Sequence, residues 1–321
     1  MIDYTSEIKE TMSALGVESG EVKLFKDGTL QSTYKIKAKT GLFVIKLFER
    51  ELMNLIQNEM NNLRRISGDG EFCVRPINKE ILEVGDKIGY YYKYFEGKKI
   101  SSLKNNNIHY RFGELTAQFD LRLSNLDFQR SKFAPESLLS NMASVGRVKM
   151  FSNDSTIASL VTKGCQILKK SKLDLDFSKI RIQYIHNDLH FDNVIYNRKT
   201  DRFFIIDTTG IRVHFLPKEL AVIVGNEFWN GKIKYKEIND LLTGYSSLIR
   251  FNEIELLSIP LFIINKKIGE LGFLQTQYYS DKISDAMYNK YVKLSSRNLH
   301  AIINNFSLIQ KYLKKYSGIK Q

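Results

Sequence analysis

The stretch 184–196 reads Tyr-Ile-His-Asn-Asp-Leu-His-Phe-Asp-Asn-Val-Ile-Tyr, a polar loop between two short apolar runs. A second apolar run, 203–206, follows closely and ends at Asp207. Because a hairpin brings its two ends together, we expect Asp188, Asn193 and Asp207 to converge. Such a set suits phosphoryl transfer. Asp188 would accept the proton of a substrate hydroxyl, and Asn193 and Asp207 would offer Mg²⁺ the hard oxygen ligands that it prefers.

The ordinary interpretation of a polar loop between strands is a solvated turn. Here several chemically suited positions coincide, apolar strands flank the loop on both sides, and a second acid follows the next strand. This context favours a functional site over a turn.

The order His-x-Asp-x-x-x-x-Asn, then a strand, then Asp207 resembles the catalytic loop and metal-binding Asp of kinases. The form His-Asn-Asp-Leu-His is closer to the aminoglycoside phosphotransferase superfamily than to protein kinases. That superfamily also holds choline kinases, type II homoserine kinases and spore-coat kinase-like proteins. The resemblance implies an α+β, bilobal protein-kinase-like fold. Residues 1–96 would form a small, antiparallel-sheet, nucleotide-binding lobe, and residues 97–321 a large, mainly helical, catalytic and substrate-binding lobe.

The N-terminal region predicts an antiparallel meander after a short helix at 2–16. Strands are predicted at 21–25, 32–38 and 42–48. The first turn contains Gly28 and lies where a kinase places its phosphate-covering loop, but the Gly-rich pattern is otherwise missing. The resemblance implies a reduced loop in which Gly28 and Ser32 bind the nucleotide. An ordinary hairpin is the alternative.

Lys46 interrupts an apolar strand, so we expect an anionic partner nearby. The predicted helix 49–65 follows, and Glu59 lies beside its apolar stripe. In the kinase pattern the strand-three Lys binds the nucleotide phosphates and is held by a Glu of this helix. Lys46 and Glu59 fit that arrangement and should approach within salt-bridge reach, at least when nucleotide is bound. A solvated Lys and a solvated Glu are the alternative.

Further strands are predicted at 73–77, 80–84 and 88–95. The resemblance implies that the last strand runs into a hinge whose backbone binds the adenine edge. Lys93, Tyr94 and Phe95 are the candidates for this contact. A core role for this aromatic run is the alternative.

The remainder of the chain has helical spacing of apolar residues. Helices are predicted at 109–126, 137–148, 155–173, 235–250, 253–269 and 284–316. After Asp207 the sequence Thr-Thr-Gly departs from the aromatic-then-acid order common in the superfamily. Glu219 stands where relatives usually have Asp at the start of a structural helix. His186 is expected to pack the loop and not to act as a base.

Length and composition bound the class of protein. With 321 residues, 43% of them hydrophobic, the chain can bury a core in two lobes. Two cysteines do not form a disulfide framework in a chain of this size, so Cys73 and Cys165 are expected to be reduced and buried. No secretory signal is recognisable, and no apolar stretch approaches the roughly 20 residues of a spanning helix. A cytoplasmic protein is therefore expected.

The formal net charge of +13 is compatible with nucleic acid or an anionic membrane surface as a partner. Yet Lys and Arg are scattered, without a basic block or a nucleic-acid motif, and an AT-rich genome would give the same excess of Lys, Asn and Ile. Both explanations remain open.

The resemblance implies an ATP- and Mg²⁺-dependent phosphotransferase that acts on a hydroxyl of a small molecule, such as an aminoglycoside, an amino alcohol or a sugar-like acceptor. The alternative is a kinase-fold binding or coat-type protein without turnover. The intact Lys46, Asp188, Asn193 and Asp207 favour the enzyme. The acceptor stays undecided, because acids and lysines are mixed in the C-terminal helices.

Overall fold

The computed structural model describes residues 3–27, 31–66, 72–103, 107–128, 155–229 and 231–316. The chain forms two compact units. Unit 1 comprises Met1–Leu103 together with Phe191–Gly210, and unit 2 comprises Lys104–His190 together with Ile211–Gln321. The loop that contains Asp188 is therefore divided, with Asp188 in unit 2 and Asn193 in unit 1. The lobe boundary at residue 97 stays a prediction.

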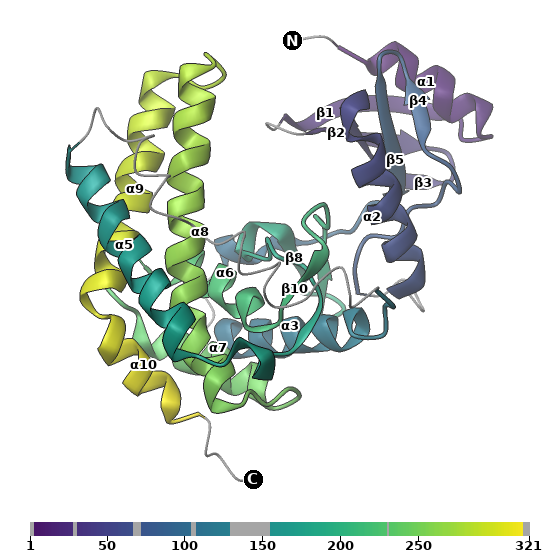
Figure 1. Cartoon of the computed structure of the whole chain (residues 1–321). Helices are drawn as coiled ribbons and strands as arrows, with labels where there is room; N and C mark the ends of the chain where they lie inside the picture. Colours follow the sequence, from purple (N-terminus) through teal and green to yellow (C-terminus); the bar gives the residue numbers. More distant parts are fainter. Residues whose placement is uncertain are drawn as a thin grey trace. The chain divides into compact units, whose positions relative to one another are not determined.

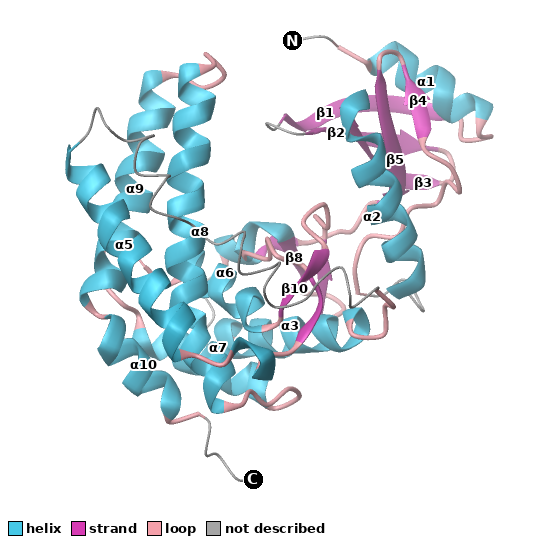
Figure 2. Ribbon diagram, viewed as in Figure 1, coloured by secondary structure: helices cyan, strands magenta, loops and turns pink. Residues whose placement is uncertain are grey.

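Unit 1 contains one antiparallel five-stranded sheet, drawn in magenta in Figure 2. Its order is β1 (Ser19–Asp27), β2 (Gln31–Ala38), β3 (Gly41–Glu49), β5 (Lys87–Lys93) and β4 (Leu82–Val84). The predicted antiparallel N-terminal sheet is confirmed. The strand predicted at 73–77 is wrong, since only Cys73 forms a bridge, and its partner is Ile205 outside this sheet. Pro76 lacks the N–H that a ladder position needs.

Helices cover both faces of this sheet, which explains why β3 reads as an almost continuous apolar run. On one face, Ile45 and its neighbours pack against Ile8 and Met12 of α1 (Thr5–Ala14), which lies beside β1 and β4 (Figure 1). On the other face, Tyr90 donates a hydrogen bond to Glu59 of α2 (Met53–Ile66). The predicted helix 49–65 thus begins one turn late, after the 3₁₀ turn η1 (Arg50–Leu52).

A second, three-stranded sheet in unit 1 carries the segment that precedes Asp207. It consists of β6 (Lys98–Lys99), β8 (Val194–Asn197) and β9 (Arg202–Ile205), with the short 3₁₀ turns η2 (Ile100–Ser102) and η6 (Phe191–Asn193) beside it. The pairing of β8 with β9 is the predicted hairpin. Gly97 has φ +151°, and a Cβ there would lie 2.5 Å from the Tyr196 carbonyl oxygen, so a larger residue would push β6 away from β8.

Unit 2 is mainly helical, as predicted. Its helices are α3 (Ile108–Leu123), α5 (Ser155–Asp174), α6 (Pro217–Glu227), α7 (Tyr235–Ser246), α8 (Glu253–Tyr279), α9 (Asp285–Asn304) and α10 (Phe306–Lys314). A short ribbon joins β7 (Ile182–Ile185) to β10 (Arg212–Phe215), and η5 (Phe177–Lys179) precedes it. The predicted helix 253–269 extends to Tyr279, the predicted helix 284–316 is divided into α9 and α10, and the predicted helix 137–148 lies outside the described residues.

Local sequence explains several of these boundaries. Asn252 and Glu255 form a capping box at the start of α8, and Asn305 interrupts the last helical stretch by donating its side-chain amide to Ala301 O at 2.8 Å. Cys73 and Cys165 are buried free thiols, as expected. Within the described ranges, no helix combines the length and apolar character needed to cross a membrane.

Candidate active site

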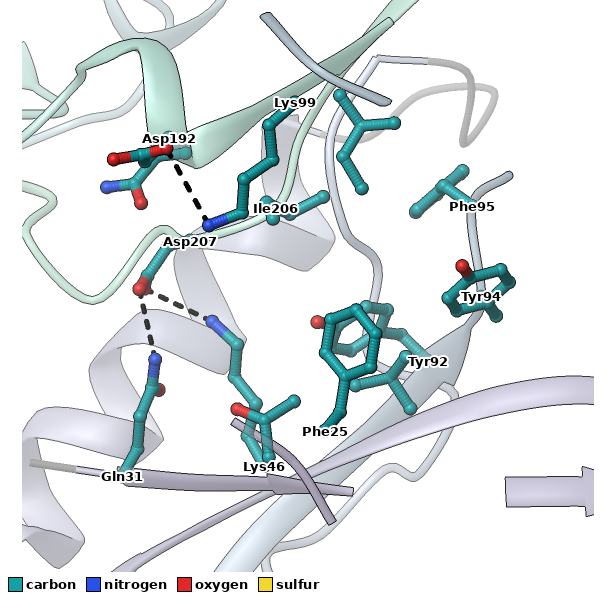
Figure 3. A pocket seen from close by; sticks show the side chains of 14 residues that line it. Phe25, Gln31, Lys46, Tyr92, Tyr94, Phe95, Lys99, Asp192, Ile206 and Asp207 are labelled. Carbon is teal, nitrogen blue, oxygen red and sulfur yellow. Dashed lines mark hydrogen bonds and ion pairs between the residues drawn. The ribbon is translucent and has the colours of Figure 1, made fainter. Parts of the chain in front are cut away.

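A cavity of about 270 Å³ opens in unit 1. One end is polar and the other aromatic (Figure 3). The residues that line it are Phe25, Gln31, Thr33, Val44, Lys46, Tyr92, Tyr94, Phe95, Lys99, Asp192, Asn193, Ile195, Ile206 and Asp207. Strand β3, strand β5 and the segment around the β8–β9 hairpin therefore all contribute to one concave site.

Lys46 and Asp207 form the charged centre of the polar end. The Lys46 Nζ lies 3.1 Å from Asp207 Oδ1, and the side chain of Lys46 is only 3% exposed. Burial by itself lowers the pKa of Lys46, but the carboxylate of Asp207 outweighs it, so the net pKa is raised and the ammonium stays charged. The anionic partner expected from the interrupted strand is therefore Asp207.

Asp207 is held from two further sides. Gln31 Nε2 donates to its Oδ2 at 3.0 Å, and Thr209 Oγ1 donates to its Oδ1 at 2.9 Å. Figure 3 shows Gln31 and Lys46 pointing to this carboxylate. Gln31 is a site residue that sequence reasoning missed. Its partner Asp207 lies 176 positions away in the sequence, and no local pattern around Gln31 indicates that contact.

Glu59 lies behind this pair and is 3% exposed. Its Oε1 accepts hydrogen bonds from Thr208 at 2.6 Å and from Tyr90 at 3.0 Å. Burial raises the pKa of Glu59, and the Lys46 charge opposes that rise. Among the described residues, the salt bridge of Lys46 is with Asp207 and not with Glu59. The direct Lys46–Glu59 contact stays a prediction for the nucleotide-bound state.

Asn193 and Asp207 line the same polar end, and the Ile206 N–H donates to Asn193 O at 2.9 Å, which holds their segments together. Within the described ranges there is no group of three or more His, Cys, Asp or Glu side chains that could hold a metal ion. Mg²⁺ does not need one, since it is usually bound through one or two carboxylates with substrate phosphates and water. This donor set therefore fits Mg²⁺ with a phosphorylated ligand.

Phe25, Tyr92, Tyr94 and Phe95 line the aromatic end. The edge of the Phe25 ring meets the Tyr94 ring at 6.5 Å between centroids. The Tyr94 N–H is already donated to Leu42 O at 2.9 Å. A flat apolar base would fit among these rings.

Two of the predicted nucleotide residues do not line this cavity, and a third is not described. Lys93 is exposed and does not line the cavity. Ser32 does not line it either, because side chains alternate along β2 and its neighbours Gln31 and Thr33 face the cavity instead. Gly28 lies outside the described residues. The nucleotide roles of these residues stay predictions.

In unit 2, Asp188 lies in the loop after β7 and is half-exposed, at 51% of its side chain. Lys266 of α8 donates to Asp188 Oδ1 at 3.2 Å, and His190 Nε2 lies 4.0 Å from Oδ2. His186 is buried and its ring lies 5.8 Å from that of Phe119, which agrees with the packing role expected for it. Asp188 is thus presented to solvent on a packed loop.

Glu219 fixes this loop from the start of α6. It is fully buried, and its Oε2 accepts from the Asn187 N–H at 2.9 Å. Asn187 has φ +65°, an uncommon conformation that the hydrogen bond stabilises. Burial raises the pKa of Glu219 to about 7. Glu219 therefore holds the backbone of the loop that contains Asp188.

The structure brings Lys46, Asn193 and Asp207 to one cavity of unit 1, with Glu59 behind them. Asp188 belongs to unit 2. Its convergence with the other three residues stays a prediction.

Comparisons with known proteins identify the family and the fold of this chain. Residues 21–224 match the profile of the "Phosphotransferase enzyme family". No curated protein sequence matches significantly. An amicoumacin kinase solved with AMP-PNP, Ca²⁺ and its antibiotic has a TM-score of 0.67 at 16% identity, over 94% of each chain.

Two other solved structures share the fold. A spectinomycin phosphotransferase, solved with ADP and spectinomycin, has a TM-score of 0.66 at 14% identity, covering 95% of this chain and 99% of that one. The ethanolamine kinase of Plasmodium vivax has a TM-score of 0.60 at 13% identity, covering 90% and 84%. These likenesses confirm the kinase-like fold class predicted from the sequence.

Proposed function

Since the chain belongs to the phosphotransferase enzyme family, we propose that it transfers the γ-phosphoryl group of ATP to a hydroxyl group of a small molecule, with Mg²⁺ as the metal. The nucleotide would bind through residues 1–96 and the acceptor through residues 97–321. The reaction is proposed to take place in the cytoplasm, where ATP is abundant.

The observation that carries the proposal is the cavity of unit 1. A buried lysine, a carboxylate and an amide lie at its polar end, and aromatic rings lie at the other. A nucleoside triphosphate has the matching pair of chemistries, a flat base and a chain of anionic oxygens. The solved relatives that hold AMP-PNP or ADP support the same choice of ligand.

We assign the contact with the nucleotide phosphates to Lys46 and the removal of the proton from the acceptor hydroxyl to Asp188. The acceptor oxygen attacks the γ-phosphorus, the bond from that phosphorus to the β–γ bridging oxygen breaks, and ADP leaves. Asp188 takes the proton that the hydroxyl loses and orients the oxygen for attack. Lys266, at 3.2 Å, keeps the Asp188 carboxylate in place between turnovers.

Asn193 and Asp207 would hold Mg²⁺, which when bound neutralises charge on the β- and γ-phosphate oxygens. For that role Asp207 must give up part of its contacts with donors such as Lys46, Gln31 and Thr209. Lys46, once released from Asp207, is free to contact phosphate and to approach Glu59.

The test is ADP formation from ATP and Mg²⁺ across a panel of hydroxylated metabolites and antibiotics, with the wild type and Asp188→Asn. The substitution is nearly isosteric and should lower turnover by about 10²–10⁴-fold while nucleotide affinity is kept. Binding of ATP without ADP formation from any acceptor would instead support the kinase-fold binding protein. Equal turnover of the two proteins would remove Asp188 from the catalytic role.

A further inference from the structure

The surroundings of Asp188 in unit 2 are rich in cations. Lys266 of α8 contacts Asp188 directly, and its charge also acts on Lys218 of α6. Arg212 of β10 acts on Lys218 as well, and it pairs with Ile185, which lies just before the catalytic loop. Arg212, Lys218 and Lys266 are called the cation cluster below. It brings three elements of unit 2 to one place.

Within the cation cluster, the positive charge of Lys218 is the one least compensated by nearby acids. It is partly buried at the second position of α6, where the helix dipole is positive and a cation is unfavourable. Within the described ranges its ammonium makes neither a salt bridge nor a hydrogen bond. Burial, Arg212 and Lys266 together lower its pKa to about 7. An anion bound here would therefore be attracted by a cation without a partner.

Among the described residues, the acids of this region pair with Lys266 and form no salt bridge with Lys218. Glu270 is engaged by Lys267 at 2.7 Å and by Ser295 at 3.2 Å, and its other carboxylate oxygen lies 3.8 Å from Lys266 of the cluster. Glu219 acts on Lys218 from nearby, but its own pKa of about 7 leaves it partly protonated near neutral pH, and its Oε2 is occupied by Asn187. Lys218 thus remains the cation of this neighbourhood for which the described acids provide no salt bridge.

Three acids elsewhere in the C-terminal helices are engaged in contacts within the fold. Glu255 caps α8 and binds Arg181 at 2.7 Å, Glu253 pairs with Lys314 at 2.8 Å, and Asp240 pairs with Lys236 at 3.0 Å. A polycationic acceptor would have to compete with these internal cations and would meet the cation cluster beside Asp188. Repulsion between the positive charges of such an acceptor and those of the cation cluster disfavours its binding.

Resting on the proposed function, we propose that the acceptor is an anionic hydroxyl compound whose carboxylate or phosphate group binds the cation cluster while its hydroxyl faces Asp188. The acceptor anion supplies the charge that Lys218 lacks. Arg212 offers the planar fork that suits a carboxylate or phosphate, and Lys218 and Lys266 offer ammonium donors. The same cations would exclude amino alcohols and aminoglycosides.

The activity test compares matched acceptors. Glycerate and a sugar phosphate are compared with ethanolamine, choline and spectinomycin by ADP release. We expect turnover only with the anionic group. Lys218→Met should raise KM for an anionic acceptor roughly tenfold to hundredfold with a smaller change in kcat, and Lys293→Met, which removes an exposed lysine of α9, should change neither. Turnover of the cationic compounds alone would overturn the proposal.

A second measurement needs no turnover and separates this inference from the proposed function. Acetylation of lysines by an amine-reactive ester is followed by mass spectrometry near neutral pH, where Lys218 should react readily because its pKa is low. Glycerate or inorganic phosphate, compared with chloride at equal ionic strength, should protect Lys218 and leave Lys293 unchanged. Protection by ATP with Mg²⁺ but by neither small anion would assign the cluster to the transferred phosphoryl group and overturn the acceptor proposal. Absence of all protection would also overturn it, whether or not the protein forms ADP.

Discussion

Replacing Lys46 by Met tests the charged centre of the proposed nucleotide cavity with little change in side-chain volume. The Met side chain keeps the buried apolar stem of the lysine and removes only the ammonium, which lies 3.1 Å from Asp207. The substitution therefore isolates the charge from the packing.

Two opposing energies decide the effect on stability. With an effective dielectric constant of about 20, the attraction at this distance is roughly 5 kcal/mol, and taking the ammonium out of water costs several kcal/mol in the other direction. Asp207 is 21% exposed and keeps Gln31 and Thr209 as donors. The loss of folding free energy should therefore stay below the roughly 3–5 kcal/mol that stranding a fully buried charge costs.

Lys46→Met should also weaken nucleotide binding. A hydrogen bond to a charged group contributes about 1.5–3 kcal/mol, which corresponds to about 10- to 150-fold in Kd. Isothermal titration calorimetry with a non-hydrolysable ATP analogue and Mg²⁺ measures this change, and urea unfolding measures the stability. Lys37→Met, which removes an exposed lysine from β2, is the matched control. If Lys46→Met binds the analogue as tightly as this control, Lys46 does not contact phosphate.

Three further outcomes are expected. Asp207→Asn should abolish the gain in nucleotide affinity that Mg²⁺ provides while metal-free binding remains, and an unchanged Mg²⁺ dependence in the titration would argue against the metal role. Gly113→Ala should lower the free energy of unfolding, measured in urea, by about 1–3 kcal/mol or more, because the new Cβ would lie 2.1 Å from Leu241 O. The control is Gly20→Ala, whose Cβ would lie 3.5 Å from its nearest contact. Equal urea midpoints for the two variants would contradict the close packing of α3 on α7. Burial raises the pKa of Glu219 to about 7, above its unfolded value, so the folded protein binds more protons between the two values and the free energy of unfolding should fall as pH rises through that window. Glu219→Gln should remove this fall between about pH 5 and about pH 8, and parallel pH profiles of the two proteins would exclude Glu219 as its source.

Local patterns were sufficient for much of the fold. Alternation and turns predicted the antiparallel strands β1 to β3, and the interrupted apolar run singled out Lys46 as a residue with an anionic partner. The β8–β9 hairpin followed from two apolar runs around a polar turn. These features depend on residues close together in the chain, and such periodicity is what a sequence displays directly.

Local patterns were insufficient where the register of a strand, or a partner far away in the sequence, decides the position of a residue. Along β2, Gln31 and Thr33 line the cavity and Ser32 between them does not, and its nucleotide role stays a prediction. The apolar segment 73–77 looked like a strand, but Phe72 and Val74 exchange hydrogen bonds with Ile205 in another part of unit 1. Propensity alone does not identify the partner of a strand.

The sequence by itself determined which chemical groups the protein possesses: the acids and the amide of the proposed catalytic loop, the lysine of β3 and the glutamate of α2. Only the tertiary structure decided their pairing, with Lys46 and Gln31 on Asp207, 161 and 176 positions away, and Thr208 on Glu59. It also decided that Arg212, Lys218 and Lys266 gather beside Asp188. The physical reason is that electrostatic and hydrogen-bond energies depend on distance in space and on burial. The order of residues along the chain gives neither quantity directly.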